Sequence, residues 1–333
     1  MTLNLFFAEK MRLRATIVQT VRQFFIDHDF IEVDTPVALT APAPEAHLEA
    51  PAVWFSGKTQ ARQQRFLQTS PELRMKRILA QGLPRIFQIA AAFRDGDYTR
   101  LHRPEFRLLE WYRLHDTWET LLSDCEELFS ACAQALEASV RFGGKELDLS
   151  RPFLRISMDE AFIKHVGFSI LDAMSKESLA ACLQERGIHF DKTDTWDELF
   201  HRVFLSVVEP ALVACQRPFF LTHFPAPLAA LARLSKSDNR VSERFEFYVQ
   251  GIELANGFGE LTDATEQRQR FVEERALRQK KGMNDYPLDE RFLQSLDSLG
   301  EAAGIALGLD RLILILLGEN DLDAVSALPW SET

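Results

Sequence analysis

The stretch FRDGDYTRLHRPEFRLLEWYR, residues 93–113, is aromatic and aliphatic at both ends and charged in its middle. Strand-like sequence covers about 85–93 and 105–114, and the Gly96-Asp97 pair interrupts the pattern between them. Two such runs joined by a polar loop predict a β-hairpin. This hairpin is the element around which the rest of the predicted fold is arranged.

Arginine is unusually frequent in the predicted hairpin for a chain with a formal net charge of −11. A loop that carries Arg94, Arg100, His102 and Arg103 suits a polyphosphate, because arginine makes bidentate contacts with phosphate and stays charged. Phe106, just inside the returning strand, is placed to stack on a base. The same arginines would also suit a hairpin tip that is only solvated.

The rest of the chain predicts helices and antiparallel strands without regular strand–helix–strand alternation. This pattern favours an α+β fold over a doubly wound sheet, in one domain. The helix at 70–82 begins Ser70-Pro71-Glu72, with Ser70 expected to cap it and Pro71 to lie in its first turn. The other predicted elements are helices over 10–28, 117–137, 262–281 and 288–298, strands over 30–36 and 217–224, a second hairpin over 244–258, a strand running into a helix over 304–318, and a mostly helical insertion over about 150–215.

The composition is that of an ordinary globular protein, with 46% hydrophobic and 26% charged residues in 333. The negative charge argues against a broad nucleic-acid-binding surface. The four cysteines form no C-x-x-C pair, which favours free thiols over zinc or redox chemistry. The N-terminus does not resemble a secretory signal, and the apolar run at 312–318 is too short to span a bilayer. We therefore expect a cytoplasmic protein without a membrane partner.

The second hairpin brings two acidic residues together. With Gln250-Gly251 as a two-residue turn, Tyr248 lies opposite Glu253, and Glu246 becomes a diagonal neighbour of Glu253. Two carboxylates at this spacing repel each other, and Mg²⁺, which prefers one or two carboxylates plus substrate phosphates, would remove that cost. A solvated strand edge with scattered glutamates would show the same pattern.

Two further segments carry candidate binding residues. In ANGFGE, residues 255–260, glycines at 257 and 259 indicate a close approach of the backbone to another group. Glu260 at its end would suit a cationic substrate, although a charge in the first turn of a helix reads the same. In GLDR, residues 308–311, Gly308 would let a ligand approach the backbone and Arg311 would reach a phosphate or a base face.

Taken in order, FIEVDTP, FRDGDYTRLHRPEF and GLDRL resemble the three motifs of the class II lysyl-tRNA synthetases, over roughly residues 10–320. The block ELANGFGELTDATEQ between the second and third motifs resembles one specific to the lysine branch. The resemblance is closer still to a truncated branch of that family, the elongation factor P–(R)-β-lysine ligases. Two features favour this branch. The catalytic core starts within about ten residues of the N-terminus, which leaves no room for an OB-fold anticodon-binding domain, and Ala306 stands where the synthetases have glycine.

The resemblance implies a class II catalytic core, an antiparallel sheet flanked by helices, that activates (R)-β-lysine with ATP and Mg²⁺. The acyl group would then pass from the aminoacyl-adenylate to a lysine side chain of elongation factor P. It implies Glu246 and Glu253 as metal ligands and Arg94 and Arg311 as catalytic residues. The implied ATP-binding residues are Arg94, Asp95, Gly96, Asp97, His102, Arg103, Phe106, Glu253, Leu254, Gly308 and Arg311. The implied substrate-binding residues are Ser70, Pro71, Glu72, Tyr112, Asn256, Glu260 and Ala306.

Two departures from the family pattern affect individual contacts. The second motif usually reads Arg-x-Glu, whereas here Asp97 follows Gly96, so either Asp97 or backbone groups would meet the adenine. Arg103 replaces an asparagine that touches the nucleotide, and it would either tighten the phosphate contact or point to a partner. Pro36 and the helix before it resemble the dimer motif, which implies a homodimer.

Other functions remain open at this point. A stand-alone paralogue that activates α-lysine, a tRNA-charging enzyme that has lost its anticodon domain, and a non-catalytic regulatory paralogue would share most of these motifs. Since the OB fold is missing, we expect no tRNA partner. Because Arg94 and Arg311 are both present, an active enzyme is favoured over a regulatory module.

Overall fold

The computed structural model describes residues 2–56, 62–137 and 140–332. The chain forms two compact units, one of Met1–Glu146 with Thr262–Thr333 and one of Leu147–Leu261. The predicted helical insertion falls inside the second unit. That the two units form a single catalytic domain stays a prediction.

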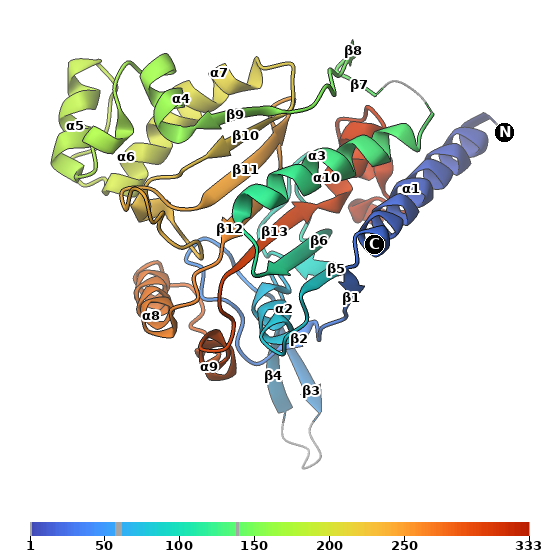
Figure 1. The fold of residues 1–333 in the computed structure, drawn as a ribbon, viewed down its shortest axis with the longest axis horizontal. Helices are drawn as coiled ribbons and strands as arrows, with labels where there is room; N and C mark the ends of the chain where they lie inside the picture. The colour runs from blue at the N-terminus through green and yellow to red at the C-terminus, as the bar shows by residue number, and fades with distance from the viewer. Residues whose placement is uncertain (1, 57–61, 138–139, 333) are drawn as a thin grey trace. The chain divides into compact units, whose positions relative to one another are not determined.

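The sheet of the first unit has the strand order β1 (Ile31–Glu32), β5 (Arg85–Phe93), β6 (Glu105–Leu114) and β13 (Ala302–Gly308), as Figure 1 shows. β1 pairs with β5 in parallel, and the other pairs are antiparallel. The predicted hairpin of β5 and β6 is confirmed at both ends. The strand predicted over 30–36 is shorter than expected, because only two of its residues pair with β5.

The alternation along β6 separates a core face from an open face. Trp111 points toward the helix side, where it packs against Phe25 of α1 (Thr2–Asp27) with ring centroids 5.2 Å apart. Glu110 and Tyr112 therefore point to the opposite face, because successive strand residues alternate. The sheet thus has one face covered by apolar packing and another on which polar groups gather.

An ion pair joins the core face to α3 (Trp118–Gln134). Arg113 donates from Nε and Nη2 to the two oxygens of Asp124, at 2.8 and 2.6 Å, and the Trp111 indole donates to the same carboxylate at 3.0 Å. Arg113 and Asp124 are only 6% and 4% exposed. The Asp124 carboxylate thus accepts hydrogen bonds from two buried side chains, Arg113 and Trp111.

Four further helices and two small sheets complete the first unit. In α2 (Glu72–Leu79) the cap prediction needs a correction: the N-cap residue is Pro71, and the Ser70 hydroxyl accepts a hydrogen bond from the Glu72 N–H at 2.9 Å. The remaining elements are α8 (Ala264–Lys280), α9 (Glu290–Leu296) and α10 (Leu309–Leu316), a sheet of β2 (Ala38–Leu39), β4 (Arg62–Leu67) and β3 (Ala52–Ser56), and a pair of short strands, β7 (Arg141–Phe142) and β8 (Lys145–Glu146).

The second unit has strands in the order β9 (Leu154–Ser157), β10 (Phe219–Thr222), β11 (Arg244–Val249) and β12 (Ile252–Gly259). Strand β9 was not predicted, because the insertion was expected to be mostly helical. The helices there are α4 (Met158–His165), α5 (Lys176–Glu185), α6 (Trp196–Val203), a π-helical turn (Phe204–Val208) and α7 (Glu209–Val213). Their apolar sides pack with β10 into one core that includes Phe162, Phe200 and Phe219.

The hairpin of β11 and β12 has the predicted two-residue turn, in which Gln250 and Gly251 have φ of 52° and 73°. Tyr248 lies opposite Glu253, as predicted, but a bulge follows between Phe247 and Tyr248. The bulge adds one residue to β12, so Glu246 pairs directly with Asn256. The simple hairpin register did not predict this pairing.

In the described part of the chain, no helix is long and apolar enough to cross a membrane. The four cysteines are free, with Cys125 and Cys132 buried and Cys182 and Cys215 partly exposed. This agrees with the thiols expected from their spacing.

The buried ion pair on the core face leads to a stability prediction. Asp124→Ala removes the acceptor of Arg113 Nε and Nη2 and of the Trp111 indole and leaves Arg113 only its longer contact with Asp116, so the free energy of unfolding should fall by about 3–5 kcal/mol. Glu290→Ala, which removes the exposed pair with Arg268, should cost less than about 1 kcal/mol. Urea denaturation measures both, and equal losses would contradict the role assigned to Asp124.

Candidate functional site

The loop between β5 and β6 contacts the start of α10 through His102 and Arg311. Arg311 Nη2 lies 2.6 Å from His102 Nε2, and its Nε donates to the Leu101 carbonyl at 3.2 Å. Burial lowers the pKa of His102, and the neighbouring Arg311 charge lowers it further. The imidazole is therefore held neutral, with Nε2 accepting from Arg311 and Nδ1 facing the Thr99 hydroxyl at 2.8 Å.

Arg94 has the features of a ligand-binding arginine. Its guanidinium lies over the Phe106 ring, 5.1 Å from the centroid, which holds the side chain in place. Its Nε is buried and makes no hydrogen bond to any of the residues that the structure describes. A buried donor without a partner is costly, so this position suits an anionic ligand.

Glu110 lies at the centre of a buried polar cluster on the open face of the sheet. It is fully buried and accepts hydrogen bonds from Ser70 Oγ at 2.7 Å and from the Tyr112 hydroxyl at 2.9 Å. Burial, and then the nearby Glu72 carboxylate, raise its pKa from 4.5 to about 8, against the effect of the two hydrogen bonds. Glu72 itself pairs with the buried Lys76 at 2.5 Å. The cluster thus holds more carboxylates than cations.

Small residues face this cluster from β13. Across the strand pair, Ala306 lies opposite Glu110 and Gly304 lies opposite Tyr112. Directly opposed residues of antiparallel strands share one face, so these small residues lie beside the polar cluster. Small side chains at these two positions would suit the wall of a substrate pocket.

A further carboxylate reaches the same region from the loop before β3. Burial raises the pKa of Glu45 to about 7, opposed by the charge of Arg94 and reinforced by that of Glu72. The loop is held by Arg278, a fully buried residue that donates to the carbonyl oxygens of Glu45 and Leu48 at 2.7 and 2.5 Å. Glu45 therefore faces Arg94 from an anchored backbone.

Glu45 and Glu110 were not predicted from the sequence. For Glu110 a signal exists, because it shares a strand face with Tyr112 and alternates with buried Leu109 and Trp111. For Glu45 there is no such signal, since it lies in an alanine- and proline-rich loop without periodicity.

The second unit gathers its own set of carboxylates around Tyr248. The tyrosine hydroxyl donates to Glu246 Oε2 at 2.7 Å, and Arg244 Nη2 donates to the other oxygen at 2.7 Å. Burial, then the charges of Glu246 and Glu253, raise the pKa of Tyr248 far above its ordinary value. Glu209 also faces this group, and burial followed by the Glu246 charge raises its pKa. The cluster is acidic overall, although among the described residues no group of three or more histidine, cysteine, aspartate or glutamate side chains is arranged to hold a metal ion.

The far end of β12 carries the remaining predicted residues of this unit. Glu260 is only 1% exposed. The Asn256 Oδ1 atom is buried and accepts no hydrogen bond from the described residues. The two predicted glycines are confirmed as close approaches: a side chain at Gly257 would collide with the Phe245 ring, and one at Gly259 would collide with Glu243. These glycines accommodate neighbouring side chains within the unit.

The predicted site residues thus fall into two sets. The first unit holds Ser70, Pro71, Glu72, Arg94, Asp95, Gly96, Asp97, His102, Arg103, Phe106, Tyr112, Ala306, Gly308 and Arg311. The second unit holds Glu246, Glu253, Leu254, Asn256 and Glu260. That the two sets form one site stays a prediction, as does a nucleotide contact for Arg103, whose guanidinium pairs with Asp321 and Asp323.

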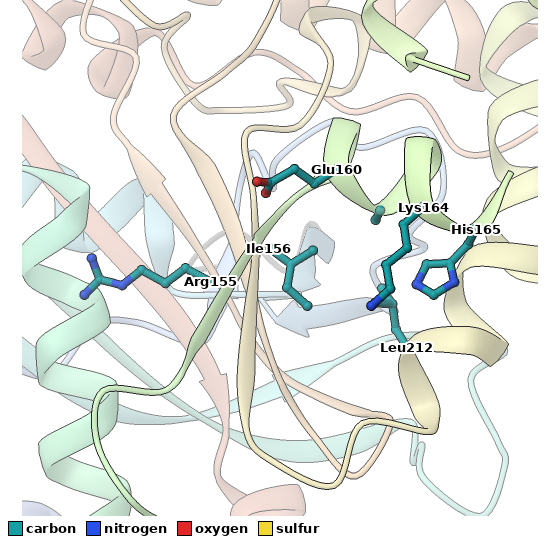
Figure 2. Close-up of a pocket in the computed structure, with 7 residues that line it drawn as sticks. Arg155, Ile156, Glu160, Lys164, His165 and Leu212 are labelled. Atoms are coloured by element: carbon teal, nitrogen blue, oxygen red, sulfur yellow. The ribbon is translucent and has the colours of Figure 1, made fainter. Parts of the chain in front are cut away.

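A separate pocket of about 210 Å³ lies in the second unit, between β9, α4 and α7. Figure 2 shows Lys164 and His165 on one side of it, with Arg155 extending in the opposite direction. Its charged groups do not converge, and none of the predicted residues lines it.

Comparisons with known proteins identify the class first. Residues 3–332 match the family described as tRNA synthetases class II (D, K and N). Relatives with the name elongation factor P–(R)-β-lysine ligase include those of Edwardsiella ictaluri, 38% identical over 94% of this chain and 93% of its own, and Proteus mirabilis, 39% identical over 95% and 93%. That of Pasteurella multocida is 38% identical over 96% and 94%.

The chain therefore belongs to the elongation factor P–(R)-β-lysine ligase family within the class II tRNA synthetases. The predicted α+β class II catalytic fold is confirmed. Membership in this class implies the use of ATP.

The raised pKa of Glu110 leads to a prediction about pH. In the unfolded chain this carboxyl ionises near 4.5, but in the folded protein only near 8. The folded state therefore binds more protons between these values, and its stability should fall as the pH rises through them. Glu110→Gln removes this titration, so the melting temperature should drop less between about pH 5 and about pH 9 than in the unsubstituted protein.

The control for this experiment is Glu105→Gln, which changes an exposed carboxylate on the same strand. It should leave the pH dependence of the melting temperature as it is. An unchanged slope in Glu110→Gln would show that Glu110 ionises normally in the folded protein.

Proposed function

We propose that this protein activates (R)-β-lysine with ATP and transfers it to a lysine side chain of elongation factor P. Two lines of support lead to this proposal. The relatives that carry this name match almost the whole chain. The first unit also buries Glu110 beside Glu72, and the cation paired with Glu72 is Lys76. An excess of buried carboxylates suits a substrate with two ammonium groups.

The reaction has two steps. A carboxylate oxygen of the amino acid attacks the α-phosphorus of ATP, the bond to the β-phosphate oxygen breaks, and pyrophosphate leaves. The ε-amine of the acceptor lysine then attacks the carbonyl carbon, AMP leaves, and the amine loses a proton to solvent. Neither step needs a covalent enzyme intermediate, so the protein contributes alignment and charge stabilisation.

Arg94 and Arg311 would act on the nucleotide. The unpartnered Nε of Arg94 gives it a donor for the α-phosphate and the attacking carboxylate. Phe106 and Arg311 would enclose the adenine, and neutral His102 would lie along the phosphates, with Asp95, Gly96, Asp97, Leu254 and Gly308 at the edges. As charge moves to the pyrophosphate, a fixed guanidinium stabilises it without reorganisation.

Glu246 and Glu253 would hold Mg²⁺. The donor set fits this ion, because carboxylate oxygens are the ligands it prefers and the cluster around Tyr248 holds the three carboxylates of Glu209, Glu246 and Glu253 beside the guanidinium of Arg244. When bound, the ion would supply Lewis-acid stabilisation of the negative charge on the phosphates.

The amino acid would lie along the small residues of β13. Glu72 and Glu110, with Ser70 and Pro71 beside them, would bind the ammonium near the reacting carboxylate. Glu260, with the Tyr112 hydroxyl, would bind the distal ammonium, and Asn256 the carboxylate. The Ala306 methyl group, opposite Glu110, would favour an amino group on the β carbon over one on the α carbon.

The exchange of radioactive pyrophosphate into ATP tests this function. Exchange should depend on (R)-β-lysine and Mg²⁺, with α-lysine markedly poorer. Arg94→Ala should lower kcat about a hundredfold or more, because the transition-state charge loses its donor. Arg107→Ala, an exposed side chain on the same hairpin, should keep normal exchange.

The other functions give different results. Exchange with α-lysine alone would indicate a stand-alone α-lysine activator, and charging of purified tRNA would indicate a tRNA-dependent enzyme. No exchange with either amino acid would indicate a regulatory protein. Transfer of labelled β-lysine to purified elongation factor P tests the second step.

The chain is also expected to form a homodimer. Large apolar side chains are exposed near the predicted dimer motif, among them Phe6 at 65% and Ile31 at 46%. Burying them in a symmetric interface would remove this apolar surface from water. Light scattering at micromolar concentration should give twice the chain mass of 38.1 kDa, and a monomer at that concentration would contradict the proposal.

A further inference from the structure

The guanidinium of Arg103 is bound at all three of its nitrogens by acceptors within the protein. A guanidinium has five N–H groups. In this structure Nη1 donates to the carbonyl oxygens of Thr99 and, at 2.8 Å, His102. Nε donates to Asp323 at 2.9 Å, and Nη2 lies 2.8 Å from Asp321 and 2.7 Å from Asp323. Each of the three guanidinium nitrogens therefore donates a hydrogen bond within the protein, and Nη2 also lies within ion-pair distance of Asp323.

The packing around Arg103 also restricts its movement. The residue is only 7% exposed, and its guanidinium lies over the Tyr98 ring, 5.0 Å from the centroid. To reach a phosphate it would have to leave two carboxylates, two carbonyls and an aromatic face. Breaking the contacts of the buried Arg103 with its two aspartates would cost more free energy than a new contact with phosphate would return.

The two acidic partners of Arg103 lie near the C-terminus. Asp323 is on a 3₁₀ helix, Leu322–Val325, and Asp321 is the residue before it. This segment is fastened to the hairpin loop a second time, because the Leu322 N–H donates to the Arg100 carbonyl at 3.1 Å. At its other end the Val325 carbonyl accepts from Arg14 of α1 at 3.3 Å. The segment thus connects the tip of the hairpin to the long N-terminal helix.

The connection also reaches the proposed nucleotide residues. Arg103 holds the His102 carbonyl, and the His102 ring contacts Arg311. Movement of Arg103 would therefore displace a pair to which we assign ATP contacts.

We propose that Arg103 is a positioning residue: it fastens the hairpin loop to Asp321 and Asp323 and thereby places His102 and Arg311 for ATP. The proposal rests on the ATP-dependent function proposed above. It accounts for the arginine at the position where the related synthetases carry asparagine. The positive charge of Arg103 forms ion pairs with two aspartates of the same chain.

This role and a direct phosphate contact predict opposite effects of removing the aspartates. If Arg103 positions the loop, Asp321→Asn with Asp323→Asn should raise the KM for ATP about as much as Arg103→Ala does. If Arg103 binds phosphate, the same double substitution should free the guanidinium and leave the KM for ATP unchanged or lower.

The experiment compares four variants in the pyrophosphate exchange assay: Arg103→Ala, the double aspartate variant, the triple combination, and Arg268→Ala as a control in an exposed ion pair. We expect the KM for ATP to rise on the order of tenfold in the first three, with kcat and the KM for β-lysine changed less. The triple variant should be no worse than Arg103→Ala, since all three residues act as one unit. The control should match the unsubstituted protein.

Two results would overturn the proposal. One is a double aspartate variant with a normal or lower KM for ATP beside an impaired Arg103→Ala. The other is a lower melting temperature in the variants with unchanged kinetic constants, which would show a structural role alone. Calorimetric titration with ATP, without amino acid, measures how each variant changes the affinity for ATP. It therefore tests the role of Arg103, Asp321 and Asp323 even if β-lysine proves to be the wrong substrate.

Discussion

The burial of the Glu110 carboxylate constrains the first unit more than any other interaction. A carboxylate without exposure needs partners, and the structure supplies them from separate elements: Ser70 from the start of α2 and Tyr112 from the same strand. Because burial disfavours the charged form and Glu72 adds a second negative charge nearby, the two hydrogen bonds do not keep Glu110 ionised, and its pKa rises to about 8. A cationic substrate would supply the missing positive charge. The close pair of Glu110 and Glu72, which is unfavourable by itself, would therefore favour the binding of such a substrate.

The local elements could be predicted from the sequence because short-range patterns determine them. Alternation and a polar break defined β5 and β6, and Gln250-Gly251 defined the turn of the second hairpin. The bulge in β12 could not be predicted, since it follows from packing across strands. Strand β9 was missed for a similar reason, because its pairing partner β10 is more than sixty residues away in the chain.

The candidate site could be predicted only in part. The motif residues carry a family resemblance and were found by it, whereas Glu45 and Glu110 are defined by their burial and neighbours. Arg103 shows the difference most clearly. Its position in the motif predicts a nucleotide contact, but its three guanidinium nitrogens bind groups that include two aspartates more than two hundred residues away. The sequence motif placed Arg103 in the loop between β5 and β6, but its pairing with Asp321 and Asp323 is visible only in the folded chain.

Arg278 anchors the backbone of the loop that carries Glu45. It holds the loop before β3 chiefly through main-chain carbonyls, those of Glu45 and Leu48. Main-chain acceptors are present whatever side chain a residue carries, so the anchoring of the loop does not depend on the identity of residue 45. That residue faces Arg94 and Glu72, where the amino acid is proposed to lie. A position of this kind is free to vary during evolution: substrate preference can change there by single substitutions while the backbone that presents the side chain stays in place.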